Sequence, residues 1–157
     1  MLFRSHRLFS DHLIEKRYEA IAGISAELSF PLTRRSRLIE GAAFMKMQEV
    51  PGVPNAETHI ALMAQRGTRA RYALRPVTGQ KHQLRAHMAA LGIPIVNDRL
   101  YPQLLAAEPI DCSSQFDRPL QLLAKEIAFI DPLSGQARRF TSRRRLADCE
   151  IDVGVGK

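Results

Sequence analysis

Apolar and polar residues alternate along several short segments of this chain, which is the pattern of half-buried β-strands. The clearest is RARYALR, where Ala70, Tyr72 and Leu74 would point inward and the arginines outward. Turn-forming sequences separate these segments, among them QRG and the hairpin-like DPLSGQ. The strands predicted in this way cover residues 16–24, 44–50, 57–63, 69–75, 120–130 and 137–142.

Two other segments repeat their apolar residues at helical spacing. The first, residues 2–13, carries Leu2, Phe9 and Leu13 on one stripe. The second runs from Thr78, a favourable N-cap residue, to Gly92 at its carboxyl end. Its apolar stripe consists of Leu84, Met88 and Leu91.

The basic segment FPLTRRSRLIEG, residues 30–41, reads as a loop. Many strands, few helices and mostly short turns predict an α+β fold with a mostly antiparallel sheet. No linker rich in Pro, Gly or Ser divides the chain, so we predict a single domain over residues 1–157.

The composition favours an anionic partner. Lys and Arg outnumber Asp and Glu by 23 to 16, which gives a formal charge of +7. Nucleic acid is the first candidate and an acidic membrane surface the second. No apolar run is long enough for a membrane span, and charges interrupt any signal-peptide core. Two isolated cysteines, Cys112 and Cys149, suggest reduced thiols and a cytoplasmic location.

Motifs for metals and cofactors are weak in this sequence. His82 and His87 are five residues apart, which separates them by about 140° around a helix. No acidic cluster, nucleophile elbow or Gly-rich phosphate loop accompanies them. We therefore expect neither a metal site nor a cofactor.

The start of the predicted second helix offers a cationic patch. With Thr78 as N-cap, Lys81 falls at N3, where only a bound anion would offset its clash with the helix dipole. His82 and Arg85 follow one turn later on a polar face. The patch suits a phosphodiester, but an ordinary solvated face would look the same.

The row of Arg69, Arg71 and Arg75 is equally ambiguous. It fits either an edge strand guarded by charge or a nucleic-acid surface.

The segment LRPVTGQKHQLRAHMAALGIPIVNDRLY closely resembles the signature of RluA-type pseudouridine synthases. That signature reads Leu-x-Pro-x-Thr-Gly-Arg-x-His-Gln-Ile/Leu-Arg-x-His, followed by Leu-Gly-x-Pro-Ile-x-Gly-Asp and a Tyr. Matching positions are Leu74, Pro76, Thr78, Gly79, His82, Gln83, Arg85, His87, Leu91, Gly92, Pro94, Ile95, Asp98 and Tyr101. The strand with Lys16 and Tyr18 fits the family's Lys-x-Tyr strand, and the resemblance spans roughly residues 12–140.

Enzymes of that family flip a uridine out of RNA, detach its base and rejoin it to C1′ through carbon. An Asp is the nucleophile, a Tyr packs against the target base and an Arg pairs with the Asp, without cofactor or metal. The resemblance therefore implies Tyr18 and Arg85 as catalytic residues, acting on ribosomal or transfer RNA. The RNA-contacting residues that we predict are Lys16, Gln80, Lys81, His82 and Gln83.

The sequence departs from the family pattern at several positions. Gln80 replaces an Arg, Asn97 replaces a Gly, and Leu123 stands where a His is frequent. More seriously, the family's nucleophile lies in a His-Arg-Leu-Asp motif well before the Tyr strand. Here HRLF places Phe9 at that Asp, much too close to Tyr18, and the nucleophile is not found.

We therefore expect the carboxy-terminal portion of a pseudouridine synthase catalytic domain, inactive as this chain alone. The alternative is a non-catalytic RNA-binding module, and a DNA-binding regulator is a weaker third because no helix-turn-helix is evident. If central strands were missing, the exposed sheet edge would favour self-association.

Overall fold

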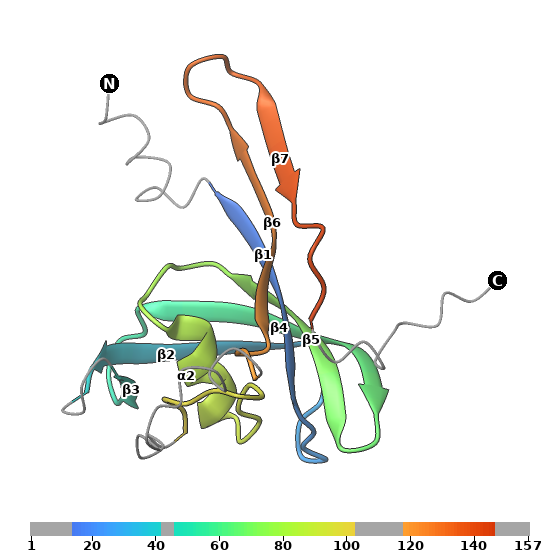
Figure 1. Cartoon of the computed structure of the whole chain (residues 1–157). Coiled ribbons are helices and arrows are strands. Elements are labelled where there is room, and N and C mark those ends of the chain that lie inside the picture. The colour runs from blue at the N-terminus through green and yellow to red at the C-terminus, as the bar shows by residue number, and fades with distance from the viewer. Residues whose placement is uncertain (1–13, 42–45, 103–117, 147–157) are drawn as a thin grey trace.

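The computed structural model describes residues 14–41, 46–102 and 118–146, which form one sheet and one helix packed against it (Figure 1). Within these residues the sheet has seven strands in the order β3-β2-β4-β5-β1-β6-β7, and every neighbouring pair is antiparallel. The α+β prediction is confirmed. The strands are β1 (Glu15–Gly23), β2 (Leu32–Glu40), β3 (Met47–Val50), β4 (Ala56–Arg66), β5 (Arg69–Pro76), β6 (Leu122–Ile130) and β7 (Ala137–Thr141), and the helix is α2 (Gln83–Ala90).

Strand β1 lies inside the sheet although it comes first along the described chain. It pairs with β5 on one side and with β6 on the other, so the sheet joins segments that are far apart in sequence. Its residues Ala20, Ile21 and Ala22 are fully buried. The position of β1 brings Tyr18 close to Leu84 of the helix.

The loop prediction for residues 30–41 was wrong, because this segment forms β2 between β3 and β4. Two of its arginines, Arg34 and Arg35, are bound by carboxylates on the neighbouring strands. Arg35 lies opposite Glu57 in the β2–β4 register and donates to it at 3.0 and 3.2 Å, while Arg34 binds Glu49. Cross-strand pairs of opposite charge stabilise a sheet, so a basic run here is compatible with a strand.

The inward residues predicted for the fifth strand are confirmed. Ala70, Tyr72 and Leu74 are all 0% exposed and belong to the main core under α2. The interpretation of this strand as a charged edge was wrong, since β5 lies between β4 and β1.

Helix α2 begins later than predicted. Thr78 is not its N-cap, because its hydroxyl accepts from the Glu57 backbone at 2.9 Å and donates to Gln83 Oε1 at 2.6 Å. The N-cap is His82, so Lys81 precedes the helix and binds Glu40 at 3.3 Å. The predicted carboxyl end is confirmed.

Gly92 follows α2 with a φ of 75°, a left-handed conformation that glycine adopts without strain.

The β6–β7 hairpin projects from the body of the sheet, together with the outer half of β1 (Figure 1). The β1–β6 register shifts between Arg17 and Tyr18, so that Lys125 is an extra residue on β6. A bulge of this kind bends the strand and increases its local twist. The hairpin predicted around DPLSGQ is confirmed, whereas the helix predicted over residues 2–13 lies outside the described residues.

Within the described ranges, no helix combines the length and apolarity needed to cross a bilayer.

Candidate functional site

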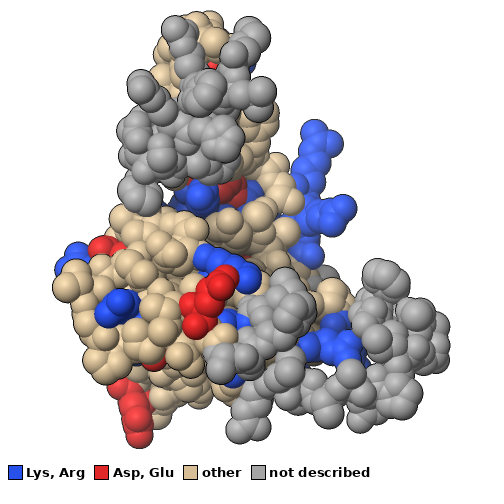
Figure 2. Space-filling view, turned by 90° about the vertical axis from the view of Figure 1, so that its left-hand side faces the viewer, with Lys and Arg blue, Asp and Glu red and all other residues tan. Residues whose placement is uncertain are grey.

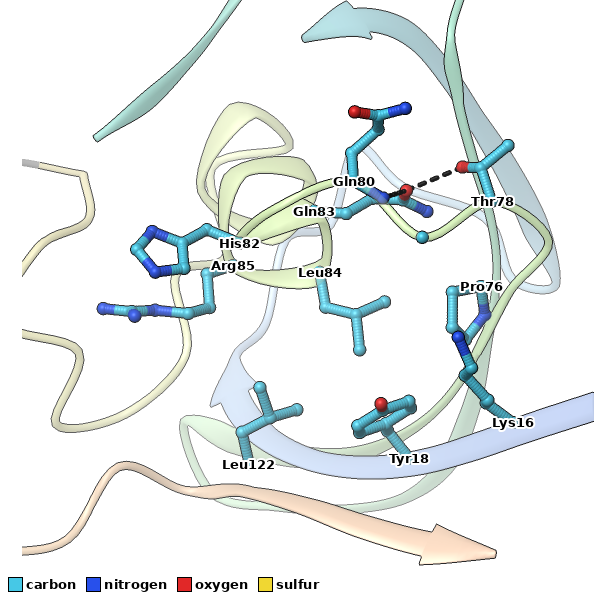
Figure 3. A pocket seen from close by; sticks show the side chains of 11 residues that line it. Lys16, Tyr18, Pro76, Thr78, Gln80, His82, Gln83, Leu84, Arg85 and Leu122 are labelled. Carbon is cyan, nitrogen blue, oxygen red and sulfur yellow. Dashed lines mark hydrogen bonds between the residues drawn. The ribbon is translucent and has the colours of Figure 1, made fainter. Parts of the chain in front are cut away.

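A pocket of about 280 Å³ opens between strand β1 and the loop that leads into α2 (Figure 3). Every predicted site residue except Lys81 contributes to its lining. These residues are Lys16, Tyr18, Gln80, His82, Gln83 and Arg85. The fold thus brings together residues that lie almost 70 positions apart.

Tyr18 forms the floor of this pocket. It lies opposite Leu74 on β5 and Ala124 on β6, directly beside the bulge at Lys125. Bulges commonly re-aim a side chain next to a functional site. In Figure 3, Leu84 of α2 projects toward the Tyr18 ring from above. One ring face therefore lies along a pocket with apolar walls and polar ends.

Gln83 holds the loop before α2 against strand β4. Its side-chain nitrogen donates to Glu57 O at 2.8 Å and Thr58 Oγ1 at 2.9 Å. Its side-chain oxygen accepts from Thr78 Oγ1 at 2.6 Å and the Gln80 backbone at 3.0 Å. The amide is 3% exposed, so its polar atoms are engaged within the protein. Gln83 shapes the pocket by fixing its loop.

Gln80 and Lys16 lie at the rim of the pocket near Gly79. Gln80 is exposed, and its side chain donates to Asn55 O at 3.3 Å. The Lys16 ammonium lies 3.7 Å from the point where a Cβ on Gly79 would stand. Lys16 therefore places a positive charge directly beside the loop.

Arg85 lies at the opposite end of the pocket from Lys16 (Figure 3). It donates from Nε to Asp98 Oδ2 at 2.8 Å and from Nη2 to Asp98 Oδ1 at 2.6 Å. This hydrogen bonding raises the pKa of Arg85, against the opposing effect of burial. The guanidinium also stands 5.3 Å from the ring centre of Tyr101. The Arg85 guanidinium is thus a cation that the Asp98 carboxylate holds in a fixed position.

Sequence reasoning missed Asp98 and Tyr101 as supports of this site. Both were present in the matched signature, but nothing in their spacing showed that they meet Arg85. Asp98 Oδ1 also accepts from the backbones of Leu100 and Tyr101, at 2.9 and 3.1 Å. Burial raises the pKa of the Tyr101 hydroxyl, which accepts a hydrogen bond from the Met47 N–H at 2.7 Å.

The backbone of His82 is left-handed, with a φ of 51°. This conformation is uncommon for a residue with a side chain and is found most often at turns and functional sites. It turns the chain sharply into α2 and sets the His82 ring edge-on to Tyr101, with 6.1 Å between ring centres.

His87 belongs to the core and not to the pocket. It is 0% exposed, and its ring nitrogens lie 2.9 Å from Thr58 Oγ1 and 3.0 Å from Ser36 Oγ. Burial lowers its pKa to about 4, so the ring is neutral at pH 7. Among the described residues, His, Cys, Asp and Glu side chains form no cluster that could hold a metal ion.

The departure at Asn97 has a simple structural reason. Its φ is 62°, so this position requires the left-handed conformation that glycine adopts most easily. Asn is among the few other residues that tolerate it. Asn97 also donates to Pro119 O at 3.0 Å, which ties down the segment before Asp98.

The pocket combines an aromatic face, an ammonium and a guanidinium, which suits a planar base attached to a phosphate backbone. Among the described residues that line it, there is no Asp or Glu. Figure 2 shows one side of the molecule, on which basic side chains form separate groups, several with acidic neighbours.

Comparison with known proteins shows which family this chain resembles in sequence. The sequence profile of the family described as RNA pseudouridylate synthase matches residues 1–90. The dual-specificity RNA pseudouridine synthase RluA of Haemophilus influenzae is 36% identical over 115 residues, which are 72% of this chain and 43% of that protein. The tRNA pseudouridine synthase C of Salmonella typhi is 33% identical over 144 residues, covering 82% of this chain and 54% of that protein.

Solved structures agree on the fold. The human RNA Pseudouridylate Synthase Domain Containing 1 superposes with a TM-score of 0.69 at 21% identity, over 89% of this chain and 58% of that one. The chain spans about half the length of these relatives. It belongs to the RluA-type family of RNA pseudouridine synthases.

Proposed function

We propose that this chain forms the uridine-binding part of a pseudouridine synthase that acts on ribosomal or transfer RNA. The observation that carries the proposal is the pocket itself, where Lys16 and Tyr18 of β1 meet Arg85 of α2. A uridine flipped out of RNA needs a stacking surface and cations for its backbone. Tyr18 offers the first, while Lys16 and Arg85 stand at the two ends of the pocket.

We further propose that the chain alone does not isomerise uridine. The chemistry of the family needs a carboxylate nucleophile beside the target base. The described lining of the pocket includes no Asp or Glu. Asp98, the carboxylate bound to Arg85, has a side chain with 0% exposure, and both of its oxygens accept hydrogen bonds.

The lack of an Asp or Glu in the described lining of the pocket also supports a second candidate, a non-catalytic RNA-binding module. The two differ in whether a partner carrying a carboxylate completes the site. Tritium release from RNA labelled with 5-[³H]uridine measures isomerisation directly. We expect no release above background with this chain, and sustained turnover would overturn the proposed inactivity.

Binding is tested separately, with fluorescence anisotropy of a labelled single-stranded RNA. Stacking on an aromatic side chain contributes about 1–3 kcal/mol per base. Tyr18→Leu should therefore weaken binding about tenfold, whereas Tyr18→Phe keeps the ring and should bind nearly as well as the wild type. If Tyr18→Leu binds as tightly as the wild type, the proposed pocket is not the uridine site.

Self-association is also proposed, through the outer edge of β7. All of its residues, Ala137–Thr141, are exposed, and one edge of the strand has no neighbour within the described sheet. Such an edge is a template for pairing with a second strand. Light scattering over a concentration series measures this, and a monomer at every concentration would contradict it.

A further inference from the structure

A second hollow, of about 520 Å³, adjoins the proposed uridine pocket on the side of the projecting hairpin. It shares Lys16 and Tyr18 with that pocket. Its other walls come from β6, from β7 and from the residue that follows β7. The side chains that matter below are Lys125, Glu126, Ile127 and Phe140.

The strand register shows that the two hollows lie on one face of the sheet. Lys16 is opposite Ile127, and Ile127 is opposite Phe140, and residues directly opposite in antiparallel strands share a face. Tyr18 is two residues from Lys16 and therefore also on that face. A continuous surface thus runs from the Tyr18 ring across the hairpin to Phe140.

Phe140 is an unusual residue for this position. It is 59% exposed on an outer strand, where apolar side chains promote aggregation. Its ring is stacked with that of Phe129, with 6.2 Å between centres and 26° between planes. One face of the Phe140 ring therefore packs on Phe129 within the hairpin. The rest of the ring is exposed and offers a flat aromatic surface beside the hollow.

The charge around the hollow is positive. Lys16 and Lys125 both line it, and Glu126 is the one carboxylate among the described lining residues. Glu126 accepts from Arg139 at 2.8 Å and lies 3.9 Å from Arg17, so its charge is neutralised.

Three exposed arginines, Arg143, Arg144 and Arg145, follow directly on Ser142 at the end of the hollow. Figure 2 shows basic side chains where the projecting part of the molecule meets its body. The surroundings therefore favour a polyanion over an apolar or acidic protein segment.

We infer that this hollow binds a nucleotide next to the target uridine in single-stranded RNA, with its base stacked on Phe140 and its phosphate near Lys16 and Lys125. The inference rests on the proposed function, since the shared residues Lys16 and Tyr18 make the hollow a neighbour of the uridine pocket. The distance between the two hollows is short because one strand, β1, lines both. An RNA strand that places a uridine over Tyr18 would continue onto this surface.

The test compares two short RNAs that each carry one central uridine. In the first, adenosines flank the uridine, and in the second, the flanking nucleotides lack their bases. The wild-type chain should bind the first RNA about tenfold more tightly, since one base stacked on an aromatic ring contributes that much. Phe140→Leu keeps apolar bulk but removes the aromatic surface, so it should abolish this preference.

Leu133→Ala is the matched control, because Leu133 is 65% exposed on the same hairpin but does not line the hollow. It should retain the preference. The inference is overturned if the wild type shows no preference, or if Phe140→Leu keeps it. It is also overturned if Phe140→Leu changes only the oligomeric state in light scattering, which would make this face a protein contact.

Failure of the proposed function gives a different result. If Tyr18→Leu leaves binding of both RNAs unchanged while Phe140→Leu abolishes the preference, the hairpin binds RNA and the uridine pocket does not. If Tyr18→Leu weakens the binding of both RNAs equally and Phe140→Leu changes the binding of neither, the uridine pocket is supported and the second subsite is contradicted.

Discussion

Arg85 and Asp98 form a two-point ion pair in which the carboxylate is fully buried and the guanidinium is 16% exposed. The bonds use Nε and Nη2 of the arginine, so Nη1 lies outside the pair. Asp98 also accepts backbone N–H groups from the segment that follows it. An arginine that the resemblance assigns to a nucleophilic carboxylate is thus held in place by a different one.

Asp98→Asn should lower the free energy of unfolding by about 3 kcal/mol, because it leaves a partly buried guanidinium without its counter-ion. Urea unfolding at pH 7 measures the change. Glu40→Gln is the control, since the exposed pair of Glu40 with Lys81 should contribute less than about 1 kcal/mol. A change below 1 kcal/mol for Asp98→Asn would show that the ion pair is not needed for stability.

Gln80→Arg should strengthen RNA binding and make it more sensitive to salt. The position is exposed at the pocket rim, and the family carries an arginine there. One added phosphate contact steepens the slope of log K against log salt by about 0.7 for a single strand. Gln65→Arg adds the same charge at an exposed position that does not line the pocket. Equal slopes for the two variants would indicate a general charge effect and no contact at residue 80.

His87 should make the protein less stable as the pH falls from 7.5 to 5. Its pKa is lowered from 6.5 to about 4 in the folded state, mainly by burial. The unfolded chain therefore binds a proton in this range that the folded chain does not. The free energy of unfolding therefore has its full value with respect to His87 above pH 6.5. It decreases as the pH falls, and the decrease reaches about 2 kcal/mol at pH 5.

Urea unfolding across this pH range measures the loss. His87→Gln should flatten the dependence, whatever its effect on stability at pH 7.5. An unchanged pH dependence in His87→Gln would assign the effect to other groups.

Asn97→Ala should destabilise the fold by about 1 kcal/mol, since a left-handed backbone costs most L-residues about 1–2 kcal/mol. Asn97→Gly, which restores the family residue, removes the bond to Pro119 but relieves the backbone, and should remain within about 0.5 kcal/mol of the wild type. Thermal unfolding of the three proteins gives the order. A glycine variant less stable than the alanine variant would mean that the side-chain bond matters more than φ.

Local patterns were sufficient for much of the fold. The alternation in RARYALR identified its buried residues correctly, and DPLSGQ marked a hairpin, because period-two burial and turn chemistry are properties of adjacent residues. Six of the residues that line the pocket were also predicted as site residues from sequence, through the resemblance of residues 74–101 and of the strand with Tyr18.

The structure corrected predictions that depended on distant partners. The arginines of β2 favoured a loop by sequence, but Glu49 and Glu57 on the neighbouring strands bind Arg34 and Arg35. Thr78 suggested a helix start, but its hydroxyl is engaged by the Glu57 backbone and by Gln83. In both cases the partner that the prediction lacked, Glu49 or Glu57, lies on another strand, and the strand order of the sheet brings it close.

Residue types at short spacing were enough to indicate the family, most of the strands and the candidate site residues, whereas β2 was missed. The three-dimensional arrangement was needed to show that Asp98 binds Arg85, that the Gln83 amide bonds within the protein and that Phe140 shares a sheet face with Tyr18. Each of these depends on which strands are neighbours and in what register. The order and register of the strands depend on pairing between segments far apart in the chain and on the core that β1, β4 and β5 share with α2, so no single segment encodes them.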